Sequence, residues 1–120
     1  MATKFATGSS KGDNSFEVGK NAAQQAMEGL SGAEPSLALV FCSSVYDYDE
    51  VVKGVRSLTK DTVLVGSSPA GAFTEKGVAP KSVVVGLIST DTYKVHAGIG
   101  TGLRESPAKA VEEALKGIPT

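Results

Sequence analysis

The chain alternates between short apolar runs and longer segments in which apolar residues recur every three or four positions. Residues 37–42 and 83–88 are continuously apolar, which is typical of strands buried on both faces of a sheet. Residues 4–7 and 63–67 are shorter strand candidates. In residues 93–99, apolar and polar side chains alternate, as in a strand with one wet face. The pattern therefore predicts one sheet with strands near residues 4–7, 37–42, 63–67, 82–89 and 93–99.

The segments between these strands have helical periodicity and recognisable start signals. A first helix is predicted over residues 16–30, with Ser15 as its N-cap. Asp47, followed three residues later by Glu50, has the spacing of a capping box and starts a second helix. Ser106 before Pro107 starts a third, because proline is well tolerated in the first helical turn.

This order of elements predicts a mixed α/β fold: β-α-β-α-β, then a β-hairpin and a C-terminal helix, in a single mixed sheet. The first three strands are expected to run parallel, and residues 82–89 and 93–99 to form the antiparallel hairpin. A chain of 120 residues suits one domain, so residues 1–120 are expected to fold as a single unit.

Charge and composition narrow the classes of function. The chain has 12 Lys and Arg against 13 Asp and Glu, a net charge of −1. This balance gives no electrostatic reason to expect nucleic acid or an anionic membrane as a partner. The single cysteine fits a reducing compartment, and the sequence has no apolar run long enough for a membrane span. We therefore expect a cytoplasmic protein.

Serine pairs follow three of the predicted strands, and they suggest a binding site. In an open α/β sheet, ligands collect at the carboxyl ends of the strands, where helix N-termini favour anions. If these loops meet there, their hydroxyls and close backbone amides predict reversible binding of a small polar or anionic molecule. No cofactor is expected, and one histidine makes a metal site built from protein ligands improbable. The candidate ligand-binding residues are Ser9, Ser43, Ser44, Gly66, Ser67, Ser68 and Gly71.

Two alternatives of another class remain open. Ser67 or Ser68 is a candidate nucleophile for a small serine hydrolase, although the glycine spacing of a nucleophile elbow is not matched. The only histidine available as a base is His96, on the polar side of its predicted strand. Cys42, at the end of an apolar run, is a candidate for redox activity, but buried cysteines more often act as small core residues.

The same residues carry a family resemblance. Residues 65–71 (VGSSPAG), Gly77-Val78, residues 82–85 (SVVV) and residues 98–100 (GIG) resemble the motifs of the FIST N domain. This family comprises sensory modules of prokaryotic signalling proteins and is related to a domain of some F-box proteins.

The resemblance implies a non-catalytic sensory domain for small ligands such as amino acids. It leaves a haem-based gas sensor, with His96 as ligand, as a further alternative. Family members usually continue into a C-terminal FIST domain. We therefore expect such a domain, or a signalling protein, as a partner, with a homodimer as the other arrangement.

Overall fold

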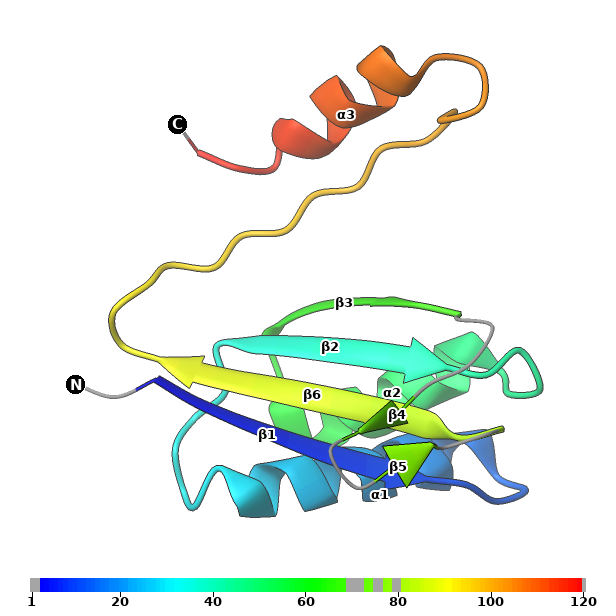
Figure 1. Cartoon of the computed structure of the whole chain (residues 1–120), viewed down its shortest axis with the longest axis vertical. Helices are drawn as coiled ribbons and strands as arrows, with labels where there is room; N and C mark the ends of the chain where they lie inside the picture. The colour runs from blue at the N-terminus through cyan, green and yellow to red at the C-terminus, as the bar shows by residue number, and fades with distance from the viewer. Residues whose placement is uncertain (1–2, 69–72, 75–76, 79–80, 120) are drawn as a thin grey trace.

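The computed structural model describes residues 3–68, 73–74, 77–78 and 81–119. In Figure 1 the body of the protein is a sheet with α1 and α2 side by side on one of its faces, and the C-terminal helix α3 stands apart. The elements along the chain are β1 (Thr3–Ser10), α1 (Ser15–Gly29), β2 (Leu37–Cys42), α2 (Tyr48–Thr59), β3 (Val63–Ser67), β4 (Phe73–Thr74), β5 (Gly77–Val78), β6 (Val83–Thr90) and α3 (Pro107–Leu115).

The sheet is mixed, with the strand order β1-β6-β2-β3, and β4 and β5 form a separate short antiparallel pair. β6 lies antiparallel to both β1 and β2, while β2 and β3 are parallel. It follows that β1, β2 and β3 run in the same direction, as predicted. The mixed α/β class is confirmed, and so is the interior position of residues 37–42.

The expected hairpin of residues 82–89 and 93–99 is wrong. β6 already has β1 on one edge and β2 on the other, so neither edge is free for residues 93–99. The continuously apolar run of β6 is explained by this central position, because residues 83–87 are buried. Residues 93–99 are extended but belong to neither sheet in the described part of the chain.

The core lies between the sheet and the two neighbouring helices. Its largest fully buried side chains come from α2 and β6 and from the end of α1: Leu30, Val51, Val55, Val83, Val85 and Leu87. The two helices approach so closely that their backbones touch at glycines. A Cβ atom on Gly19 would overlap the carbonyl oxygen of Val51, and one on Gly54 would overlap that of Phe16.

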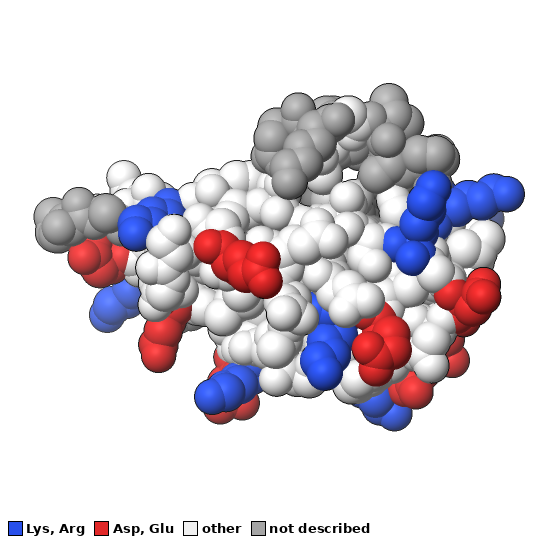
Figure 2. Space-filling view, turned by 90° about the horizontal axis from the view of Figure 1, so that it is seen from below, with Lys and Arg blue, Asp and Glu red and all other residues white. Residues whose placement is uncertain are grey.

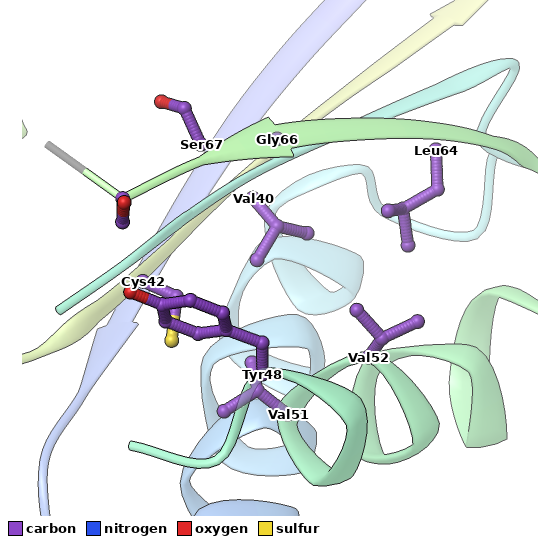
Figure 3. A pocket seen from close by; sticks show the side chains of 9 residues that line it. Val40, Cys42, Tyr48, Val51, Val52, Leu64, Gly66 and Ser67 are labelled. Carbon is purple, nitrogen blue, oxygen red and sulfur yellow. The ribbon is translucent and has the colours of Figure 1, made fainter. Parts of the chain in front are cut away.

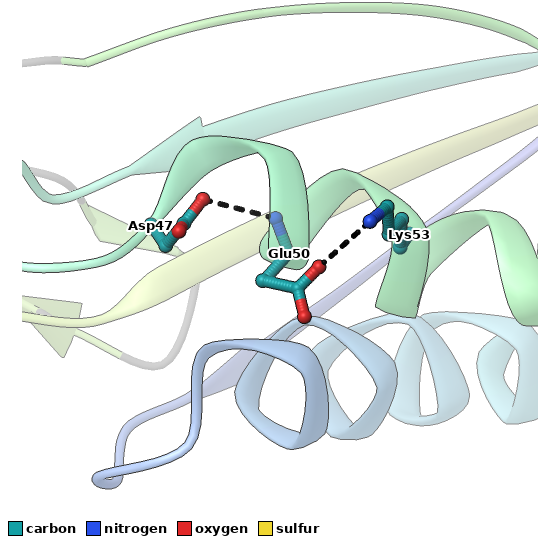
Figure 4. Close-up of polar contacts among 3 residues, drawn as sticks. All are labelled: Asp47, Glu50 and Lys53. Carbon is teal, nitrogen blue, oxygen red and sulfur yellow. Dashed lines mark hydrogen bonds and ion pairs between the residues drawn. The ribbon is translucent and has the colours of Figure 1, made fainter.

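The start of α2 confirms the prediction for Asp47. Its Oδ1 accepts a hydrogen bond from the backbone N of Glu50 at 3.3 Å, and Glu50 pairs with Lys53 at 3.1 Å (Figure 4). The N-cap predicted for α1 is wrong by one residue, because Asn14 caps that helix through the backbone N of Glu17. The Ser15 hydroxyl instead accepts from the backbone N of Asp47 at 3.0 Å and joins the two helix starts.

Replacing Asp47 with alanine is expected to lower the free energy of unfolding by about 1 kcal/mol, because the capping acceptor is lost. Asp49→Ala is the matched control. Asp49 lies in the same first turn, but no cap depends on it, so only a few tenths of a kcal/mol should be lost. Urea denaturation of both variants measures the difference, and equal losses would contradict the role of Asp47 as the cap.

The chain after β6 forms a C-terminal arm, defined here as residues 93–118, which stands away from the sheet (Figure 1). Ser106 caps α3 and Pro107 opens it, as predicted. Six large apolar side chains of the arm are exposed by 39% to 79%, so the arm presents a continuous set of apolar residues to the solvent. They are Tyr93, Ile99, Leu103, Val111, Leu115 and Ile118.

Charged side chains of both signs are mixed on the protein surface (Figure 2). On the face shown in Figure 2, basic and acidic side chains are interspersed, in keeping with the net charge of −1. In the described residues, no helix is long and apolar enough to cross a membrane.

Candidate functional site

A groove lies between α2 and the carboxyl ends of β2 and β3, with a volume of about 310 Å³ (Figure 3). In Figure 3, Val40 and Leu64 project from the sheet toward Val52 on α2, and the ring of Tyr48 lies at the end of the groove near Cys42. Most of the lining is aliphatic. It consists of Val40, Cys42, Tyr48, Val51, Val52, Leu64, Gly66, Ser67 and Ser68.

Strand alternation explains why these residues face α2. In β2, Ala38, Val40 and Cys42 are buried on the helix side. The parallel register pairs Ala38 with Leu64 and Val40 with Gly66, so Leu64 and Gly66 share that side. A Cβ atom on Gly66 would overlap the carbonyl oxygen of Val40. Gly66 therefore allows β3 to approach β2 at the mouth of the groove.

The polar groups of the groove are few. Ser67 projects away from α2 in Figure 3, so its backbone contributes to the lining more than its hydroxyl. Ser68 follows it and also lines the groove. Cys42 is buried, and its Sγ donates to the carbonyl oxygen of Ser43 at 3.4 Å. Burial raises the pKa of the Cys42 thiol, which keeps it protonated and weakly nucleophilic at neutral pH.

The charge around the groove does not favour an anion. The backbone N of Glu50 at the start of α2 is already bonded to the Asp47 carboxylate. Asp49 adds negative charge in the same turn, where the positive end of the helix dipole would otherwise attract an anion, while Glu50 is paired with Lys53. The apolar walls favour a ligand with an apolar body over a small free anion.

The structure brings together three of the predicted site residues and separates others. Gly66, Ser67 and Ser68 line the groove with Cys42. Ser9 lies at the same end of the sheet but on β1, opposite Val84 of β6. Because β6 and β2 stand between β1 and β3, Ser9 is three strand spacings from Ser67, about 14 Å.

The second serine loop has a local structural role. The backbone N of Ser43 donates to the carbonyl oxygen of Ser82, and the carbonyl oxygen of Ser43 accepts from the backbone N of Tyr46 at 3.1 Å. Ser44 is exposed, and neither serine lines the groove. The remaining predicted residue, Gly71, lies outside the described residues.

Sequence reasoning missed Tyr48, Val52 and Leu64. Tyr48 and Val52 lie one helical turn apart on α2, and both line the groove. The sequence did show a tyrosine at the first position of the helix that follows the strand at residues 37–42. That position could have marked Tyr48 as a residue near the carboxyl end of the strand. Nothing in the sequence indicated that this helix leaves a gap beside β3.

The groove contains Cys42, Ser67 and Ser68, the candidate nucleophiles of the two enzyme alternatives, but not the histidine that a hydrolase would need as a base. His96 is exposed on the C-terminal arm and does not line the groove. No group of three or more His, Cys, Asp or Glu residues that could hold a metal occurs among the described residues.

A second cavity of about 370 Å³ lies on the opposite face of the sheet, beside Phe5, Phe41 and Val84.

The comparisons with known proteins assign the family. A sequence model of the FIST N domain matches residues 36–119, a segment that contains the whole groove as well as β6 and α3. A search of curated proteins gave no match. FIST domains are sensory, non-catalytic domains of signal-transduction proteins. Because the match covers well over half of the 120 residues, the chain belongs to the FIST N domain family.

Proposed function

We propose that this FIST N domain senses a small amphiphilic molecule, of the kind represented by an amino acid with an apolar side chain, in the groove beside α2. The observation that carries the proposal is the combination of an aliphatic groove with Ser67 and Ser68 at its open end. The apolar part of the ligand packs against Val52 and Leu64, and its polar end faces Ser68, the backbone of Ser67 and the Tyr48 hydroxyl. Binding is reversible and involves no chemistry.

The sensory role extends to partners and location. Ligand occupancy is passed to a C-terminal FIST domain or to a separate signalling protein, and the domain works in the cytoplasm. The position of the groove supports the transmission of ligand occupancy. The groove lies between the strand β3 at the edge of the sheet and the helix α2, and both elements can shift when a ligand fills the gap between them.

A thermal-shift screen of the full chain tests the proposal, with leucine, isoleucine, valine and phenylalanine against acetate and aspartate. A ligand at about 100 times its dissociation constant should add about 2.7 kcal/mol of stability. We expect stabilisation by apolar amino acids and none by acetate. Stabilisation by acetate and aspartate alone would contradict the apolar character of the site.

Replacing Ser68 with valine is expected to weaken binding of the amino acid found in the screen by about 1–3 kcal/mol, because a polar group of the ligand loses its partner. Ser44→Val is the matched control, since Ser44 is equally a loop serine but does not line the groove. Calorimetric titration measures both affinities. Equal affinities of the two variants would show that the ligand does not reach Ser68.

A further inference from the structure

The face of the sheet opposite α1 and α2 is apolar and partly exposed. Alternation places Ala6 and Leu87 on the side of the core, so Phe5 and Ile88 project to the opposite side. We call this side the open face. Its large apolar side chains come from all four strands: Phe5, Leu37, Leu39, Phe41, Val65 and Ile88. Of these, Phe5 is 58% exposed and Val65 is 37% exposed.

The composition of the open face is unlike that of a sheet surface in contact with water. The four strands, residues 3–10, 37–42, 63–67 and 83–90, contain a single charged residue, Lys4. Lys4 precedes Phe5 and therefore lies on the helix side. A sheet with one wet face normally carries polar side chains there. The open face also contains the second cavity, which is lined by Leu39, Val84 and Gly86 among others. These features indicate a face that packs against another layer of protein.

The chain turns toward the open face directly after β6. Thr90 projects to this side, two residues after Ile88, and its Oγ1 lies 3.0 Å from that of Thr3. The same Oγ1 accepts hydrogen bonds from the backbone N of Thr92 at 3.1 Å and from that of Tyr93 at 3.4 Å. Two amides bonded to one side chain bend the backbone to the side on which that side chain lies. The C-terminal arm therefore leaves the sheet on its open side.

The extended part of the arm has an apolar side that faces the sheet. A Cβ atom on Gly98 would overlap the carbonyl oxygen of Ala114 in α3, and Gly100 makes a similar contact one turn earlier in the helix. Alternation then places four apolar residues on the side away from α3: Tyr93, Val95, Ala97 and Ile99. In Figure 1 the extended segment lies between α3 and the sheet, so this apolar side is turned toward the strands.

The link between β6 and the arm can span two packed layers. Stacked layers lie about 10 Å apart, and the link from Thr90 to Tyr93 spans at most about 10 Å. A segment returning over β6 with Tyr93 above Thr90 would run antiparallel to β6. It would place Val95 over Ile88, and Ile99 over Val84 in the second cavity.

We propose that the C-terminal arm closes over the open face of its own sheet as a hinged cover, with Val95 against Ile88 and Ile99 in the second cavity. The hinge is at residues 91–92. The arm moves as a rigid unit, because its extended segment and α3 are in backbone contact. A tether this short gives the arm an effective concentration of about millimolar at the face, which favours it over a second copy of the chain.

Closure does not compete with ligand binding. The groove beside α2 is walled by Val40 and Leu64, which project to the helix side of the sheet. The arm covers the other side. The cover and the groove are therefore tested separately, and the absence of a ligand in the groove leaves the closure unaffected.

Nuclear Overhauser effects between methyl groups of the full chain test the closure, because they arise only between protons that are close in space. Cross-peaks are expected between Ile99 and Val84 and between Val95 and Ile88. A sample that mixes isotope-labelled and unlabelled chains identifies the donor of the arm. Cross-peaks that join a labelled chain to an unlabelled one would show that a second copy supplies the arm, and would overturn the proposal. Absence of both cross-peaks would overturn it as well.

Ile99→Lys is expected to open the cover, because it places a charge in the apolar cavity. The cross-peak between Val95 and Ile88 should be lost, and the fluorescence of the apolar dye 8-anilinonaphthalene-1-sulfonate should rise as the open face becomes accessible. Val111→Lys is the matched control, since Val111 is 54% exposed on α3, beyond the extended segment. It should change neither signal. Retention of the cross-peak in Ile99→Lys, or an equal rise in dye fluorescence in both variants, would contradict the closure.

Discussion

A valine in place of Gly54 is expected to lower the free energy of unfolding by at least about 3 kcal/mol. A Cβ atom at this position would overlap the carbonyl oxygen of Phe16 and lie 2.8 Å from the backbone N of Lys20. Both atoms belong to the α1 backbone, which cannot move aside without separating the two helices. Domains of this size are stable by only about 5–15 kcal/mol, so a large share of the stability would be lost.

Gly12→Val is the matched control for Gly54→Val. Gly12 lies in the exposed loop before α1, where a Cβ atom would meet only the Cγ2 of Val18 at 3.3 Å. Because that side chain can adjust, we expect a loss below about 1 kcal/mol. Chemical denaturation of the two variants gives the difference. If both glycines tolerated valine equally well, the close packing of α1 on α2 would be wrong.

Leu87→Ala is expected to cost about 3–4 kcal/mol, because it removes a fully buried side chain from the strand at the centre of the sheet. β6 has a neighbour on each edge, so the surrounding strands cannot close the cavity left behind. The free energy of unfolding in urea measures the loss.

The neighbouring residue supplies the control for Leu87. Ile88 projects to the opposite face of the sheet and is only half-buried, so Ile88→Ala should cost clearly less, about 1–2 kcal/mol. A larger loss for Ile88 than for Leu87 would mean that β6 presents its other face to α1. The two variants therefore test the register of β6 as well as its position.

The local features of the fold were predictable from the sequence. The starts of α2 and α3 follow from the chemistry of their first residues, because a side chain at the N-cap satisfies an amide only a few residues away. Asp47 and Ser106 both act as predicted. The interior position of β2 follows in the same way from its unbroken apolar run, since only a strand covered on both sides needs one.

The pairing of β6 could not be predicted in this way. Its register joins Val83 to Ser10 and to Cys42, contacts between residues far apart in the chain that no local pattern specifies. The alternation in residues 93–99 predicted a strand that the structure does not form, because alternation alone contains no information about a pairing partner. Proximity in sequence favoured a hairpin, and the occupied edges of β6 exclude it.

The part of the site that lies at the carboxyl ends of the strands was predictable from the sequence. Parallel strands do bring Ser67 and Ser68 to the same end of the sheet as Ser9 and Ser43, as expected. The insertion of β6 between β1 and β2 then separates Ser9 from the others, and the sequence gives no sign of that insertion. The apolar walls of the groove depend on how α2 lies over β3, which is likewise set by packing between distant segments.

Binding of an amphiphilic ligand in the groove beside α2 can be observed directly in a nuclear magnetic resonance titration of the full chain with leucine. The methyl and amide signals of Val40, Val52 and Leu64 should shift together and saturate, while the amide signals of Phe5 and Val84 on the opposite face stay in place. Shifts confined to Phe5 and Val84, or none at millimolar leucine, would contradict the account.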